Sequence, residues 1–396
     1  MSTATHKSPL TDWTVIVPVV ALIALVFSWG RELPGFAVGL VALCLAGAVL
    51  AAVHHAEVVA HRVGEPFGSL VLAVAVTVIE VALIVTLMAD GGDKTASLAR
   101  DTVFAAVMIT CNGIVGLSLL VGALRNRVAV FNAEGSGAAL ATVATLAVLS
   151  LVLPTFTTSK PGPEFSAAQL TFAAVASLAL YGLFIAVQTV RHRDYFLPVA
   201  TGAAAGGTGA EGDGDGGHAE PPTLRATLIS LGLLLVALVA VVGDAKSVSP
   251  AIEAGVAKAG LPNAVVGVII ALLVLAPETL AAVRAARRDR VQTSLNLGYG
   301  SAIASIGLTI PAIALASIWL TGPLLLGLGP VHMVLLALTV VVSALTIAPG
   351  RATLLQGGVH LVILAAYLRG PRRPRRGLPP QARPGNGARR VGLHPA

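Results

Sequence analysis

Two glutamates lie inside long apolar stretches of this sequence. Glu80 follows Thr77-Val-Ile, and Glu278 follows Leu275-Ala-Pro. A charged side chain at membrane depth costs between about 2.5 and well over 10 kcal/mol. No Lys or Arg lies near the middle of any apolar stretch, so neither glutamate has an evident salt-bridge partner. We expect both to bind an ion or carry a proton; the alternative is a protonated glutamate that is hydrogen-bonded between helices.

Other oxygen-bearing side chains lie near these glutamates. A hard cation such as Ca²⁺ takes six to eight oxygen ligands, and two carboxylates supply at most four. Ser301, Ser305 and Thr309 are spaced by four and form one polar stripe on a helix. The alternative for each hydroxyl is a bond to its own helix or to a neighbouring helix. The expected metal-ligating set is Glu80, Glu278, Asn112, Ser301, Ser305, Thr77, Asn296 and Thr309.

Prolines interrupt two of the same stretches. Pro277 has no N–H and frees the carbonyl of Leu273, and Pro311 frees that of Gly307. Unwound carbonyls at the binding depth of transporters can coordinate cations. A simple packing kink is the alternative.

The composition places these residues in a membrane. Of 396 residues, 56% are hydrophobic and 11% are charged, and the mean hydropathy is +0.86. A soluble protein has about 25% charged residues. This balance excludes a nucleic-acid binder, a disordered chain and a soluble domain with one anchor. Both cysteines, Cys44 and Cys111, lie in apolar stretches, which argues against a disulfide framework or a zinc site. No cofactor is expected.

Eleven apolar segments are long enough to be considered as spans. They are continuous rather than alternating, which excludes a β-barrel, and backbone groups in lipid must be satisfied within a segment. The sequence therefore predicts an all-α, polytopic membrane protein. The segments are Trp13–Trp29, Pro34–Val53, Gly68–Ala89, Val103–Leu124, Ala138–Leu153, Ala167–Val190, Leu224–Gly243, Leu261–Val283, Leu295–Leu320, Leu324–Ile347 and Ala352–Leu368.

A Gly-rich acidic stretch divides these segments. It contains Glu211, Asp213, Asp215 and Glu220. One extra helix precedes two sets of five, and an odd number per set makes the second set enter the membrane from the opposite face, as in inverted-repeat transporters. The predicted divisions are 1–30 for the N-terminus and extra helix, 31–190 for the first repeat, 191–223 for a cytoplasmic linker, 224–368 for the second repeat and 369–396 for a basic, disordered tail.

Basic residues set the expected orientation. Twelve Lys and Arg lie on the side of the N-terminus and six on the opposite side, so the N-terminus should be cytoplasmic and the protein should lie in the inner (plasma) membrane. The basic tail would then lie outside the cell, although basic segments normally lie on the cytoplasmic side. Either the tail contributes little to the orientation, which is the interpretation we favour, or the predicted number of helices is wrong by one.

At the two glutamates the sequence resembles the cation/Ca²⁺ exchanger superfamily, and within it the bacterial calcium/proton antiporters. The matching blocks run from Ala56-Glu57 through Gly64-Glu65-Pro66-Phe67 to Glu80, and from Pro277-Glu278 through Ser294-Leu-Asn296 to Pro311. The resemblance implies that both glutamates are cation and proton sites, with Asn112 and Ser301 as supporting positions. Val107-Met108 stands where the family has Gly-Ser, which favours proton over sodium coupling.

These observations together predict a secondary antiporter that exports Ca²⁺ in exchange for H⁺ by alternating access. A Na⁺/H⁺ or K⁺/H⁺ antiporter using the same glutamates is the alternative. The expected partners are the lipid bilayer, inorganic cations and protons, and no nucleic acid. An intramembrane enzyme is disfavoured because no HExxH motif or nucleophile–base pair is evident in the segments. A passive channel is disfavoured by two titratable residues in inverted halves.

Overall fold

The computed structural model describes residues 12–64, 67–89, 96–199, 222–261, 264–320 and 322–370. The Gly-rich part of the linker and the basic tail, both assigned from sequence, lie outside the described residues. Within them, eight helices are long and apolar enough to cross a membrane, and a bent pair of helices makes up to nine. Two shorter apolar helices coincide with the first and last expected segments. The protein is therefore a polytopic helical membrane protein, and the count of eleven spans remains a prediction.

The first part of the chain contains α1 to α7. Asp12 caps α1 by accepting a hydrogen bond from the Thr14 backbone N–H at 3.2 Å, and Ser166 and Gln169 form a capping box at α7. Three π-helical turns interrupt or end the helices. The elements are α1 (Trp13–Ser28), α2 (Gly35–Val63), α3 (Phe67–Met88), α4 (Leu98–Met108), η2 (Ile109–Ile114), α5 (Val115–Asn126), β1 (Ala129–Val130), α6 (Ala133–Ala147), η3 (Val148–Val152), η4 (Leu153–Thr155), α7 (Ala167–Ala186), η5 (Val187–Arg191) and η6 (Arg193–Phe196).

The second part contains α8 to α13. Thr223 caps α8 and Thr353 forms a capping box with Gln356 at α13. The elements are α8 (Leu224–Lys258), α9 (Ala264–Val274), α10 (Ala276–Arg287), α11 (Val291–Ala316), α12 (Pro330–Ile347), β2 (Arg351–Ala352) and α13 (Leu354–Arg369).

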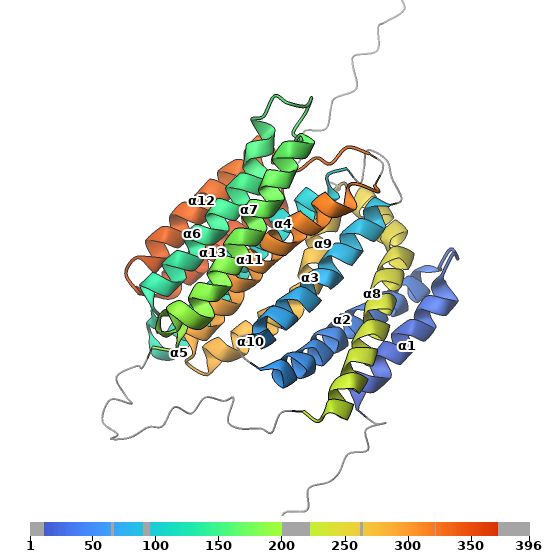
Figure 1. The fold of residues 1–396 in the computed structure, drawn as a ribbon, viewed down its shortest axis with the longest axis horizontal. Helices are drawn as coiled ribbons and strands as arrows, with labels where there is room; N and C mark the ends of the chain where they lie inside the picture. Colours follow the sequence, from blue (N-terminus) through green and yellow to red (C-terminus); the bar gives the residue numbers. More distant parts are fainter. Residues whose placement is uncertain are drawn as a thin grey trace, which may run out of the picture.

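The helices form two groups with a central layer between them (Figure 1). In the figure α1, α2 and α8 lie together on the right, and α6, α7, α12 and α13 lie on the left. The pairs in contact include α2 with α8, α3 with α11, α4 with α9, α7 with α11 and α13 with α5. If α3 corresponds to α9, and α11 to α4 and α5, the contact of α3 with α11 matches that of α9 with α4, and the contact of α7 with α11 matches that of α13 with α5. Two inverted repeats would produce this pattern of contacts, and the division into repeats remains a prediction.

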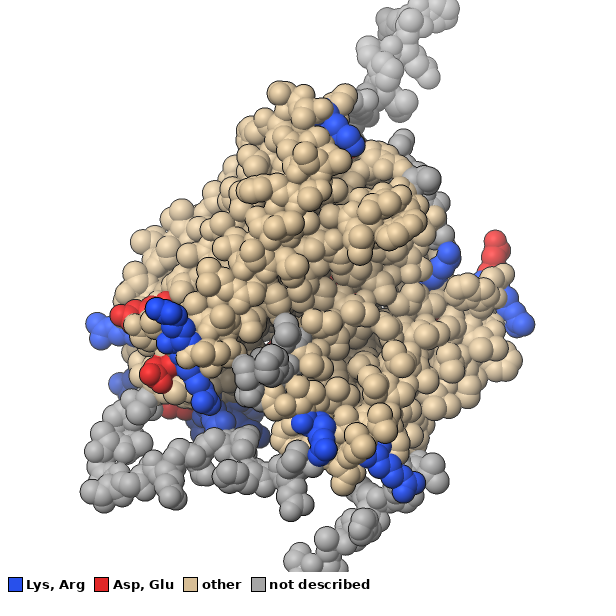
Figure 2. Space-filling model, viewed as in Figure 1, with Lys and Arg blue, Asp and Glu red and all other residues tan. Residues whose placement is uncertain are grey.

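Contacts between loops define one end of the molecule. β1 pairs antiparallel with β2, which joins the connections after α5 and after α12. Arg125 donates to the Arg287 carbonyl at 2.6 Å, so the connection after α10 lies at the same end. Figure 2 shows charged side chains gathered at the lower edge and at the upper and right margins, with a broad tan surface between them. These basic loops therefore share one side, as the sequence predicted.

Several helix bounds differ from the sequence prediction, and three of these differences change how the chain is interpreted. The second expected segment ended at Val53, whereas α2 continues for about three more turns to Val63. The seventh ended at Gly243, whereas α8 continues to Lys258 with Pro250 inside it. The eighth was drawn as one segment but is broken at Leu275, where its two parts meet at 56°. Apolar character sets the first two predicted limits, but amphipathic ends continue the helix beyond the apolar part.

Candidate functional site

A partly open cavity of about 180 Å³ lies between α3, α7, α9, α10 and α11. Both Glu80 and Glu278 line it. The two carboxylates are close enough for their charges to interact. Side chains separated by about two hundred positions in sequence therefore face one space, as an ion site between two repeats requires.

Glu80 is held by the polar stripe of α11. It lies in an unbroken part of α3 and is 5% exposed. The Ser305 hydroxyl donates to both of its carboxylate oxygens, at 2.8 and 3.0 Å. Thr309, one turn further along α11, lies next to the same carboxylate and is also buried. Residues i and i+4 share a helix face, so the α11 stripe meets α3 at Glu80.

Glu278 sits at a helix break instead. Leu275 separates α9 from α10, Pro277 lies in the first turn of α10, and Glu278 follows it. The positive end of the α10 dipole favours a negative charge there. One oxygen of Glu278 has no hydrogen-bond partner among the described residues. Because Pro277 has no N–H, it cannot donate to the Leu273 carbonyl, which therefore loses its helical donor.

The remaining sequence-predicted residues divide into two groups. Thr77, Asn296 and Ser301 line the cavity with the two glutamates. Asn296 donates to the Phe196 carbonyl at 2.6 Å and accepts from Gln292 at 2.8 Å. These bonds fix the amide at the end of the cavity where the first half passes into the linker.

Asn112 lies elsewhere. It is in the π-helical turn η2, where its amide donates to the Thr339 hydroxyl at 3.0 Å and its oxygen lies 3.2 Å from Nδ1 of His360. His360 contacts the Thr346 hydroxyl at 3.2 Å through its other nitrogen. The structure therefore joins Asn112 to α12 and α13, and it is not among the residues that line the cavity. Thr110, two residues earlier, donates back to the Ala106 carbonyl at 2.8 Å.

The sequence analysis missed two polar residues of α7 and η5. Tyr181 and Gln188 both line the cavity, and the Tyr181 hydroxyl is buried without a hydrogen-bond partner among the described residues. Gln188 was detectable as an amide inside an apolar segment. Tyr181 gave no such signal, because tyrosine is common in helices at any depth.

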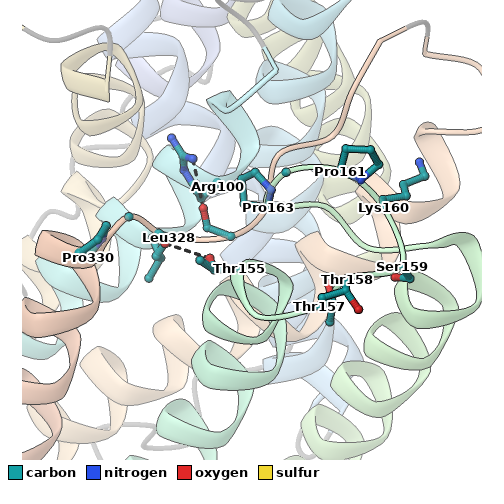
Figure 3. Close-up of a pocket in the computed structure, with 13 residues that line it drawn as sticks. Arg100, Thr155, Thr157, Thr158, Ser159, Lys160, Pro161, Pro163, Leu328 and Pro330 are labelled. Carbon is teal, nitrogen blue, oxygen red and sulfur yellow. Dashed lines mark hydrogen bonds between the residues drawn. The ribbon is translucent and has the colours of Figure 1, made fainter.

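A larger pocket of about 720 Å³ lies near the opposite end of the molecule. Figure 3 shows Arg100 and Thr155 reaching the segment before α12. Arg100 donates to the Gly327 carbonyl at 3.2 Å and Thr155 to that of Leu328 at 2.9 Å. The residues that line this pocket include the basic Arg100 and Lys160 and no carboxylate. The positive charge of the pocket therefore does not suit a cation.

The chemistry of the smaller cavity is that of a cation or proton site. Two carboxylates supply up to two negative charges, and hydroxyls and an amide supply neutral oxygens. Among the described residues no three His, Cys, Asp or Glu side chains are placed to hold one metal ion. A cation here would therefore complete its shell with hydroxyl, amide and carbonyl oxygens and with water, as Ca²⁺ readily does.

Comparison with known proteins gives the same class. The chain is 45% identical to the putative ionic transporter y4hA of Sinorhizobium fredii over 359 residues, which cover 90% of this chain and 95% of that protein. It is 35% identical to the sodium-potassium/proton antiporter ChaA of Escherichia coli, with 91% and 96% covered. The fold resembles the crystal structure of the H⁺/Ca²⁺ exchanger CAX, with a TM-score of 0.67 and 16% identity over 90% of this chain and 87% of that chain.

The family model described as sodium/calcium exchanger protein matches residues 31–190 and 229–370. The matched ranges cover α2 to η5 and α8 to α13 and leave α1 outside. The chain belongs to this family of membrane cation antiporters.

Proposed function

We propose that this protein exchanges Ca²⁺ for H⁺ across the plasma membrane, with Glu80 and Glu278 binding either the cation or protons. The observation that carries the proposal is that both carboxylates line one cavity between the helices. Two carboxylates match the charge of one divalent ion. A buried, unpaired charge is costly, so the empty site favours protonated glutamates and the loaded site favours deprotonated ones.

The unequal surroundings of the two glutamates support an exchange cycle. Glu80 accepts from Ser305 in the described state, whereas Glu278 keeps an oxygen without a partner. Glu278, at the break between α9 and α10, is then the carboxylate with an oxygen available to take up a ligand first.

A second candidate is exchange of Na⁺ or K⁺ for H⁺ at the same glutamates. The specific observation in its favour is the 35% identity to the antiporter ChaA over nearly the whole chain. A monovalent ion would need only one deprotonated carboxylate. The two candidates therefore differ in the number of deprotonated carboxylates that the transported ion needs, which is two for Ca²⁺ and one for Na⁺ or K⁺.

The test is dissipation of an acid-interior pH gradient in everted membrane vesicles. Addition of Ca²⁺, Na⁺ or K⁺ is followed by a pH-sensitive dye, with vesicles lacking the protein as control. Ca²⁺ should collapse the gradient at lower concentration than either monovalent ion. A response to Na⁺ and K⁺ with none to Ca²⁺ would replace the first candidate by the second, and no response to any of them would reject both.

We further propose that the N-terminus and the basic loops face the cytoplasm. The support is the shared end defined by β1, β2 and the Arg125–Arg287 contact, together with the excess of basic residues there. With that orientation, the exchanger would remove cations from the cytoplasm by using the inward proton gradient.

A further inference from the structure

A third carboxylate is buried outside the glutamate cavity. Asp244 lies in α8, has no exposed surface, and neither of its oxygens has a hydrogen-bond partner among the described residues. It is not among the residues that line the glutamate cavity. The predicted segment ended one residue before it, at Gly243, so the sequence analysis placed Asp244 in a loop. A buried carboxylate without a partner requires a ligand or a proton.

The surroundings of Asp244 are formed by α1 and α2. The adjacent Gly243 has no room for a Cβ atom, because the Leu25 side chain of α1 lies too close to it. Helices α1 and α8 therefore approach closely at this point. Cys44 of α2 lies near Asp244. The family match leaves α1 outside. Asp244 is therefore covered in part by a helix that is additional to the two repeats.

A path to the surface begins one helical turn from Asp244. An open pocket of about 460 Å³ is lined by Ser28 at the end of α1 and by Ser247 of α8. The Ser28 hydroxyl lies 3.1 Å from the Ser247 hydroxyl. Ser247 is three residues after Asp244 and thus shares its helix face. The Ser247 hydroxyl donates to the Gly243 carbonyl at 3.1 Å and makes no hydrogen bond to Asp244. A route from the pocket to the carboxylate therefore needs one bridging water molecule between Ser247 and Asp244.

We propose that Asp244 is a proton-binding site, separate from Glu80 and Glu278, that is filled from this pocket through Ser28 and Ser247. A hydronium ion in the pocket gives a proton to the Ser28 hydroxyl, which passes its own proton to Ser247. Ser247 passes its proton to the bridging water, and that water gives one of its protons to the carboxylate, which becomes a carboxyl. Both serines end as they began, and one water is released. Arg31, Lys246 and Glu32 line the pocket, so its basic excess opposes metal cations.

Few other ionisable groups face this position. Of the helices packed against α8, α1 and α9 carry none and α3 carries only Glu80. In α2, His55 contacts the Thr14 carbonyl near the start of α1. Asp244 lies instead near the end of α1, because the adjacent Gly243 packs against Leu25. The other ionisable residues of these helices are Cys44, His54, Glu57, His61 and Arg62 in α2 and Arg225, Lys246, Glu253 and Lys258 in α8.

Infrared difference spectroscopy of the reconstituted protein tests this site. The background is the Glu80→Gln, Glu278→Gln double variant, so the result does not depend on transport. A carboxyl C=O band should be present at mildly acidic pH, disappear at alkaline pH, and be missing after Asp244→Asn. If the Asp244→Asn protein does not assemble, Asp244→Ser replaces it in the same measurement. A band that persists in these variants, or a carboxyl that does not titrate, would overturn the assignment.

The path is tested by kinetics after a pH jump. Ser247→Ala should slow the appearance of the band by about tenfold, as expected when one hydrogen-bonding group is lost from a transfer path. Ser249→Ala is the matched control, because Ser249 lies on the same helix but bonds to Glu253 at 3.2 Å and does not line the pocket. Equal rates in the two serine variants would refute the route through Ser247.

Discussion

Replacing either cavity glutamate by glutamine should abolish Ca²⁺/H⁺ exchange. Glu80 is almost fully buried, so its charge is poorly screened. With an effective dielectric constant of about 20 and a separation of about 4 Å, each pair of unit charges contributes about 4 kcal/mol, and a divalent cation gains about 8 kcal/mol from one carboxylate.

Part of that gain is offset by the cost of desolvating the ions. If about half remains, roughly 4 kcal/mol is lost on substitution, which corresponds to about a thousandfold in affinity. The substitution also removes a proton carrier, so coupling should fail together with binding. Glu80→Gln combined with Glu278→Gln should be no worse than either change alone, because groups that act as a unit are not additive.

Ser305→Ala is the matched control within the site. It removes the hydroxyl that lies 2.8 and 3.0 Å from the Glu80 oxygens but leaves both charges in place. A hydrogen bond to a charged group contributes about 1.5 to 3 kcal/mol, so the apparent KM should rise by about tenfold to a hundredfold while exchange remains coupled. Glu134→Gln, an exposed carboxylate in the first turn of α6, controls for loss of charge alone.

The assay is Ca²⁺-driven proton flux in everted vesicles with matched amounts of protein, measured over a wide range of Ca²⁺ concentrations. Exchange of wild-type magnitude in Glu80→Gln or Glu278→Gln would remove that residue from the ion site. An equal loss in Ser305→Ala and Glu80→Gln would show that charge is not the deciding quantity.

Three other predictions concern topology, the Asn112 contacts and the helix break. In a cysteine-free background, a cysteine at Arg288 should resist an impermeant thiol reagent in intact cells and one at Lys160 should react; the reverse pattern would invert the orientation. Asn112→Ala should lower thermal stability by leaving the His360 and Thr339 groups with fewer partners, at a cost of about 1 to 3 kcal/mol, while changing the cation KM less than Ser305→Ala does; a larger change in KM would place Asn112 at the ion. Pro277→Ala restores an N–H at the break between α9 and α10 and should reduce the maximal flux more than it reduces thermal stability; unchanged flux would make the break a packing feature only.

The sequence by itself determined the class of structure and pointed to the two glutamates of the candidate site. Apolar stretches without charge could only be helices in lipid, and two carboxylates within them stood out because membrane burial is costly. Pro277 located the helix break near Glu278, because proline cannot donate the hydrogen bond that a continuous helix needs. The spacing of Ser301, Ser305 and Thr309 placed them on one face because the helical period is fixed.

The tertiary structure decided which of these groups meet. Ser305 reaches Glu80 because α11 packs on α3, a contact between distant segments that no local pattern specifies. Asn112 faces His360 and Thr339 instead of the cavity because the π-helical turn η2 packs against α12 and α13. Asp244 is buried only because α8 continues past the end of its apolar part and α1 packs beside it. Helical period and residue type fix which side chains share a face, but only packing between helices fixes what that face touches.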